Sequence, residues 1–140
     1  MHTRSTPAWH AWSGYAFENI CLRHVPQIKK ALGISGLKTE HSSWRHHPDT
    51  LAKAGAQIDL VIDRRDGVIN LCEMKFSDSE FIIDKKYAGE LLNKRDTFRS
   101  VTGTRKTLFL TLITAHGVKP GTWKADLVQN ELVAGALFEP

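Results

Sequence analysis

The chain has 140 residues, of which 41% are hydrophobic and 24% are charged, and its formal net charge is +4. These values are typical of a globular protein with a core of its own, so we expect residues 1–140 to form a single domain. No apolar run approaches the roughly 20 residues that span a bilayer, which excludes a membrane-spanning helix.

The N-terminal segment MHTRSTPAWHAW lacks the apolar stretch of a secretory signal. Cys21 and Cys72 are the two cysteines, and both lie in apolar periodic segments. We therefore expect a cytoplasmic protein in which both thiols are free and buried. The basic net charge permits a polyanionic partner without demanding one.

In the first half of the chain, apolar residues at helical spacing predict a helix from Trp12 to His24. A proline then either kinks this helix or begins a second one, Pro26 to Leu32. We expect a strand near Leu37 to Ser43. The polar segment from His41 to Ala56 is interpreted as a loop.

The second half begins with two apolar strands around a turn, within Gln57 to Ser77. The clearest later helix is Asp84 to Val101, and Thr107 to Thr114 is a strand rich in β-branched residues. Trp123 to Val128 is predicted as an edge strand and Glu131 to Phe138 as a short helix or turn. This order predicts an α/β fold, a mixed central β-sheet flanked by helices on both faces.

The register of the two-strand segment QIDLVIDRRDGVINLCEMKFS depends on its turn. A loop of two residues, Asp66 and Gly67, would place Asp59 opposite Met74. A three-residue loop fits at least as well, because Gly67 then takes the left-handed position that this loop type needs. Asp59 then lies opposite Glu73. In that register one face carries Asp59, Val61, Ile69, Leu71, Glu73 and Lys75, and the other carries Ile58, Leu60, Ile62, Cys72 and Met74.

Two facing carboxylates in a sheet are costly. Directly opposed side chains have Cβ atoms about 5 Å apart, where two like charges repel by about 3 kcal/mol at an effective dielectric constant of about 20. A divalent metal ion would remove the repulsion between Asp59 and Glu73, and oxygen ligands with waters suit Mg²⁺. Lys75 would then sit beside a metal-bound water. The alternative is that Lys75 simply pairs with one of the two acids.

These residues resemble the PD-(D/E)XK nuclease superfamily. Asp59 corresponds to the first acid and Glu73-Met74-Lys75 to the (D/E)XK element, while Ile58 stands where the family has its characteristic proline. An initial helix supplies another acid in that family, and Glu18 in GYAFENIC lies there. The resemblance implies a restriction-endonuclease-like core.

The stretches GYAFE, IDLVIDR and CEMKF are also similar to C-terminal nuclease-like domains of bacterial AAA-type ATPases. No GxxxxGK[ST] phosphate-binding loop is present in this sequence. The resemblance therefore implies a domain from the C-terminal end of a longer ATPase chain, with the ATPase module of that chain as its partner.

By the same resemblance, Asp59, Glu73 and the carbonyl of Met74 would bind Mg²⁺ or Mn²⁺, and Glu18 would help directly or through water. Lys75 would orient or deprotonate the attacking water, so Glu18, Asp59, Glu73 and Lys75 are the expected catalytic residues of a phosphodiesterase acting on DNA or RNA. Glu18 has another explanation, as a helix acid favoured by the macrodipole. A non-catalytic, regulatory nucleic-acid- or partner-binding module is the alternative function.

The predicted helix after the (D/E)XK element carries a basic face. We expect this face to bind nucleic acid, with DNA favoured, unless it is merely solvated, and its residues are Lys85, Lys86, Lys94, Arg95 and Arg99. Tyr87 and Lys94 are candidates to contact the scissile phosphate, although core packing is the favoured explanation for Tyr87. Zinc is disfavoured, because the segment that holds His41, His46 and His47 has no cysteine.

Overall fold

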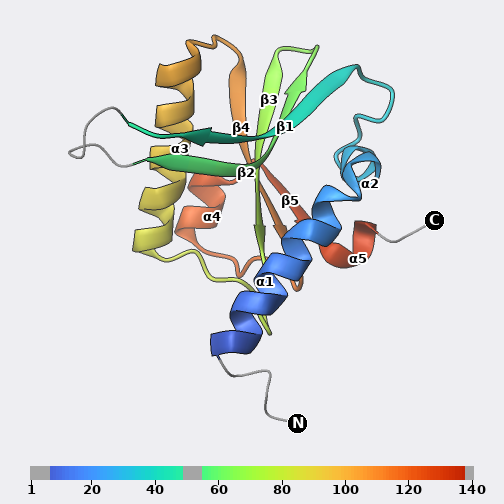
Figure 1. Ribbon diagram of the computed structural model, residues 1–140, viewed down its shortest axis with the longest axis vertical. Coiled ribbons are helices and arrows are strands. Elements are labelled where there is room, and N and C mark those ends of the chain that lie inside the picture. The colour runs from blue at the N-terminus through green and yellow to red at the C-terminus, as the bar shows by residue number, and fades with distance from the viewer. Residues whose placement is uncertain (1–6, 49–54, 138–140) are drawn as a thin grey trace.

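The structure, a computed structural model, describes residues 7–48 and 55–137. In this part of the chain, five strands form one open sheet in the order β1-β2-β3-β4-β5 (Figure 1). The strands are β1 (Thr39–His46), β2 (Ala56–Arg64), β3 (Val68–Lys75), β4 (Thr107–Thr114) and β5 (Asn130–Val133), and the helices are α1 (Pro7–Leu22), α2 (Val25–Ala31), α3 (Lys85–Thr102), α4 (Thr122–Leu127) and α5 (Ala134–Leu137). Neighbouring strands are antiparallel from β1 to β3 and parallel from β3 to β5.

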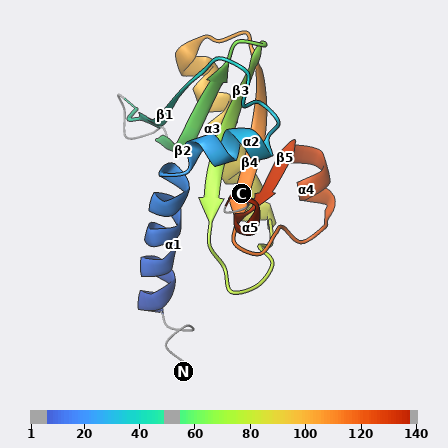
Figure 2. The same ribbon diagram turned by 90° about the vertical axis from the view of Figure 1, so that its right-hand side faces the viewer.

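Helices cover both faces of this mixed sheet, so the predicted α/β architecture is confirmed. Two apolar clusters make up the core, one on each face. Tyr87, Leu91 and Phe98 of α3 pack on one face, and Phe17, Cys21 and Ile28 of α1 and α2 pack on the other. Figure 2 shows α2 in front of the strands and α3 behind them.

The β2–β3 hairpin has the predicted three-residue loop. Across the hairpin Val61 pairs with Leu71 and Leu60 pairs with Cys72, which is the register that places Asp59 opposite Glu73. Gly67 has a φ of 87°, in the left-handed region where a glycine costs least. The turn residue therefore fixes the register on which the site depends.

One residue of the predicted face pattern is wrong. Ile58 packs with Val61 in the α3-side cluster, and not with Leu60 on the opposite face. The cause is a β-bulge, because Ser42 pairs with Val61 while Trp44 pairs with Ile58. One residue of β1 thus faces two residues of β2, Asp59 and Leu60, and the alternation of side chains shifts by one at this point.

The predicted loop from His41 to Ala56 is also partly wrong, because β1 continues to His46. β1 is the edge strand of the sheet and most of its side chains are exposed, which explains its polar sequence. Trp44 anchors it, with its ring 5.1 Å from that of Phe98 in an edge-to-face contact. Residues 49–54 of the predicted loop lie outside the described residues.

At the C-terminal end one prediction is wrong and the other is half right, because the segment Glu131 to Phe138 is a strand up to Val133 and helical over Ala134–Leu137. Trp123 to Val128 is not an edge strand, since α4 occupies Thr122–Leu127, with Leu127 buried one helical turn after Trp123. The segment predicted as a helix or turn begins instead with β5, which pairs with β4 and buries Leu132. Of the residues described after β5, the four of α5 are helical.

The cysteines follow the prediction, because Cys21 and Cys72 are both free and buried. Burial raises the pKa of the Cys21 thiol to about 12, so this side chain is a packed apolar group and not a nucleophile. Among the described residues, no helix is long and apolar enough to cross a membrane.

Candidate active site

Asp59 and Glu73 meet where β2 and β3 stop pairing. The backbone N–H of Asp59 donates to Oε2 of Glu73 at 3.1 Å, and the backbone N–H of Met74 donates to Oδ2 of Asp59 at 2.9 Å. Each carboxylate thus accepts a hydrogen bond from the strand that carries the other. These bonds replace ladder hydrogen bonds beyond Leu60 and Cys72, and they hold the predicted pair of acids together.

Glu73 is almost completely buried, with 2% of its surface exposed. Burial raises the pKa of this carboxyl above its usual range, and the nearby Asp59 raises it further. Lys94 of α3 acts in the opposite sense, because its ammonium donates a hydrogen bond to Oε1 of Glu73 and forms an ion pair with it. Both oxygens of Glu73 are therefore in use.

Glu18 reaches the same place from α1, which packs on β3. Its side chain is half-buried, and burial followed by the charge of Asp59 raises its pKa. Lys75 and Lys94 lower that pKa, so all three charged groups lie within electrostatic reach of Glu18. Glu18 therefore senses the charge of Asp59, but among the described residues the three acids do not form a group arranged to hold a metal ion, so its role as the third acid stays a prediction.

Lys75 takes a position that neither sequence interpretation described. Its Nζ lies 5.1 Å from the centre of the Tyr87 ring, a cation–π contact. The Tyr87 ring is fixed in turn by an edge-to-face contact with Phe81. Within the described parts of the chain no ion pair joins Lys75 to Asp59 or Glu73, so structural pairing with these acids does not account for Lys75.

The hydroxyl of Tyr87 is buried and has no hydrogen-bond partner among the described residues. Burial raises its pKa, and the charges of Glu73, Asp59 and Glu90 raise it further, so the hydroxyl lies near the acids. A buried hydroxyl without a partner is unusual in a folded protein. Its proton is available to an acceptor that enters the cluster.

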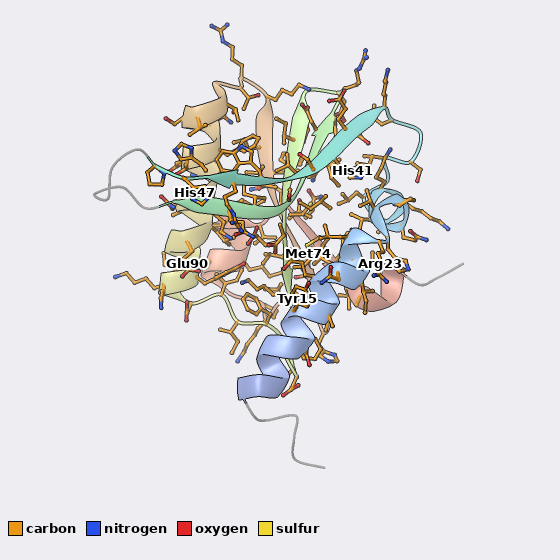
Figure 3. The ribbon with its side chains drawn as sticks, viewed as in Figure 1. Tyr15, Arg23, His41, His47, Met74 and Glu90 are labelled. Atoms are coloured by element: carbon orange, nitrogen blue, oxygen red, sulfur yellow. The ribbon has the colours of Figure 1, made fainter. Side chains whose placement is uncertain are left out.

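These residues fit a hydrated divalent ion. No group of three His, Cys, Asp or Glu side chains in residues 7–48 and 55–137 has the arrangement of a complete protein-built metal site. Mg²⁺ does not need one, because it usually binds one or two carboxylates and keeps several waters. Asp59, Glu73 and the carbonyl of Met74 would be its protein ligands, and Glu18 fits contact through water. Figure 3 shows Met74 close to α1, with Glu90 on α3 farther to the left.

Two hollows of the surface adjoin the cluster along α3. One, of about 260 Å³, is lined by Lys75, Phe81, Ile82, Asp84, Lys86, Tyr87 and Glu90. The other, of about 490 Å³, is lined by Gly55, Ala56, Gln57, Lys86, Gly89, Glu90, Asn93 and Lys94. Lys86 and Glu90 line both, so the two hollows are neighbours on the surface of α3, with Lys75 in one and Lys94 in the other.

The five basic residues of α3 have different surroundings. Lys85 and Lys86 are exposed in the first turn, after Asp84, which caps the helix by accepting from the N–H of Tyr87. Arg95 pairs with its neighbour Asp96 at 3.3 Å. Arg99 donates to the carbonyls of Thr104 and Lys106, which fixes the loop after α3. The first turn thus presents the least constrained positive charge.

The histidines do not form a cluster for zinc. His41 and His46 lie on β1, and the ring of His46 stacks on Trp44 with 6.1 Å between ring centroids. His47 follows the strand and is exposed. No zinc-type ligand group appears in the described parts of the chain.

The sequence matches no protein-family model and no curated protein. One solved structure that it resembles is that of AF1548, a protein of unknown function, with a TM-score of 0.51 and 16% sequence identity. The aligned region covers 78% of this chain and 54% of the AF1548 chain, so the chain spans about half of that protein. At this identity the likeness shows a shared α/β fold.

Proposed function

We propose that this chain is a metal-dependent nuclease domain of the PD-(D/E)XK type, which hydrolyses phosphodiester bonds in DNA or RNA. One observation carries the proposal. Asp59 and Glu73, two carboxylates on adjacent strands, each accept a hydrogen bond from the backbone of the other's strand, and Lys75, two residues after Glu73, lies over the Tyr87 ring. Two carboxylates so close together cost stability unless a cation compensates their charge, and a divalent metal ion would compensate both.

The residues have separate tasks in this reaction. A bound Mg²⁺ or Mn²⁺ would supply Lewis-acid stabilisation of the phosphate and a lower pKa for water. Asp59, Glu73 and the Met74 carbonyl would hold this ion, and Glu18 would support it through water. Lys75 would orient the attacking water, and only as a neutral amine would it accept the water proton. The buried Tyr87 hydroxyl, which has no partner among the described residues, would donate a hydrogen bond to a phosphate oxygen.

The proposal includes a partner and a cellular setting. Nucleic acid, most simply DNA, would lie over the two neighbouring hollows that Lys75 and Lys94 line, and the exposed Lys85 and Lys86 would hold its backbone. Free buried thiols suit the reducing cytoplasm. The likeness of GYAFE and CEMKF to ATPase-linked domains supports an ATPase module of the same longer chain as a partner.

The test is a cleavage assay on mixed DNA and RNA substrates with and without Mg²⁺ or Mn²⁺. Wild type should cleave only with metal, and Asp59→Asn should not cleave. Asp63→Asn is the matched control, because Asp63 lies on the same strand but pairs with Lys106 at 2.6 Å. Metal-independent cleavage, or equal loss in both variants, would contradict the proposal.

A second function is favoured by the ion pair between Lys94 and Glu73. This pair satisfies the buried carboxylate without a metal ion, as expected of a non-catalytic regulatory module that binds nucleic acid or a partner. Wild-type protein that binds nucleic acid with the same affinity in the presence and absence of metal, and never cleaves it, would support this module.

A further inference from the structure

Lys94 bonds Oε1 of Glu73, the oxygen of this carboxylate that accepts no backbone hydrogen bond. We propose that Lys94 is the counter-ion of the metal-free site, and that a divalent metal ion and Lys94 compete for Glu73. Metal binding then releases the ammonium of Lys94 into the hollow beside α3, where it is available to a substrate phosphate. This inference rests on the proposed metal-dependent function and deepens it.

The buried charge of Glu73 needs compensation. Only 3% of its side chain is exposed, and an ionised carboxylate at such a position is strongly disfavoured without a compensating charge. The amide of Asp59 satisfies Oε2 but carries no net charge. Lys94 is the cationic side chain that bonds the remaining oxygen, Oε1. It therefore supplies the compensation in the metal-free protein.

A metal ion and the Lys94 ammonium would repel each other if both bound Oε1 of Glu73. Mg²⁺ binds carboxylate oxygens at about 2.0–2.1 Å. A metal ion on Oε1 would lie within a few ångströms of the Lys94 ammonium, because both would contact the same atom. Like charges so close together in a buried setting repel strongly. Because Asp59 fixes the other oxygen of Glu73, the carboxylate cannot simply turn to serve both cations.

Lys94 has an open route away from Glu73. Its side chain is 21% exposed and lines the hollow of about 490 Å³, so it does not have to cross packed residues to move. Glu90 lines the same hollow one helical turn earlier on α3. A Glu four residues before a Lys is the favourable arrangement for an ion pair on a helix. The freed ammonium thus has an anionic neighbour, next to the proposed path of the substrate.

The experiment measures Mn²⁺ binding by calorimetry, in the absence of nucleic acid. Lys94→Met should bind Mn²⁺ more tightly than wild type, by roughly tenfold, as for other coupled sites. It should melt below wild type without metal, and the difference should shrink at saturating Mn²⁺. Lys86→Met is the matched control for the loss of a nearby positive charge, since Lys86 lines the same hollow but does not contact Glu73. Its Mn²⁺ affinity should stay close to that of wild type.

Two further variants test the same idea if Lys94→Met does not fold. Lys94→Gln keeps a hydrogen-bond donor for Glu73 without the charge and should also gain Mn²⁺ affinity, whereas Lys94→Arg keeps the charge and should not. Unchanged or weaker Mn²⁺ binding in both neutral variants would overturn the competition and leave the proposed nuclease function standing. Failure of wild type and all variants to bind Mn²⁺ would overturn both.

Discussion

Asp59 donates its backbone N–H to the carboxylate of Glu73, and the neighbour of Glu73, Met74, donates its own N–H to the carboxylate of Asp59. The two acids are thereby held by main-chain donors, which do not move as freely as side chains. Side chains that are already held in place lose little conformational entropy when an ion binds to them. A metal ion bound as proposed would therefore meet acids that need no rearrangement, and Lys94 would be the side chain that moves.

The metal should stabilise the fold through these acids. Mg²⁺ or Mn²⁺ should raise the melting temperature of wild type, because a ligand that binds only the native state stabilises it. Asp59→Asn should melt higher than wild type without metal, since one of two close like charges is gone, and it should lose the metal response. Thermal melts of both proteins, with Asp63→Asn as control, test this. Equal metal-induced shifts in wild type and Asp59→Asn would rule out a shared site.

Lys75 should serve the chemistry and not the binding. Lys75→Ala should lower cleavage by about 10²–10⁴-fold, the usual contribution of a general acid–base group, while Mn²⁺ affinity and nucleic-acid affinity change little. Tyr87→Phe is an informative companion, because it keeps the ring under Lys75 and removes only the unpartnered hydroxyl. Single-turnover rates measure both variants. Wild-type rates in Lys75→Ala would remove Lys75 from the mechanism.

The first turn of α3 should contact phosphates. Replacing Lys85 and Lys86 together with Ala should flatten the dependence of log affinity on log salt by about two on duplex DNA, and weaken all sequences alike. Exposed residues at the hairpin end, Lys38 and Arg65, provide the control pair. Binding is measured at several salt concentrations. A slope unchanged from wild type would mean that these lysines are only solvated.

The burial of Glu73 predicts a pH dependence of the metal-free protein. The folded-state pKa of Glu73 lies above its ordinary value of 4.5, so folding favours the neutral acid. This contribution to stability is complete below the ordinary pKa and is lost as pH rises through the raised pKa. Glu73→Gln cannot lose stability in this way, because a glutamine side chain does not ionise. The melting temperature of Glu73→Gln should therefore gain on that of wild type as pH rises from about 4 to about 8.

The exposed acid Glu80 supplies the control for this measurement. Glu80→Gln should follow wild type across the same range, because its side chain lies in solvent. Melting curves collected without metal, in a chelating buffer, give the comparison. A constant difference between Glu73→Gln and wild type at all pH values would show that the Glu73 carboxylate is ionised as easily in the fold as in the unfolded chain.

The hairpin was predictable because its determinants are local. Gly67 selects the loop, the loop sets the register, and the register brings Asp59 to Glu73. Lys94 was recognisable as basic, but its true partner was missed. The signal was present, since Leu91, Lys94 and Phe98 have the 3,4 spacing of one helical stripe, and a lysine in a buried stripe needs an anion.

Other features depended on contacts between distant segments. The polar sequence of β1 does not look like a strand, because an edge strand with exposed side chains has no apolar alternation to detect. Trp44 of β1 is held by a ring contact with Phe98, which is 54 residues away in the sequence and lies on α3. Likewise the four residues of β5 form a strand because they pair with β4 and because Leu132 is buried there.

The bulge in β2 shifts the alternation of its side chains between the two faces of the sheet by one residue. Ile58 before it and Val61 after it both pack in the α3-side cluster, although three positions separate them along the strand. Asp59 stands at the change of phase, where its side chain belongs to neither apolar cluster. Deleting a single residue at the bulge would restore an unbroken alternation of side chains along the whole of β2. A variant of this protein with one residue fewer at the bulge would therefore place Asp59 or Ile58 on the wrong face of the sheet. The number of residues in this segment matters to the site as much as their identity does.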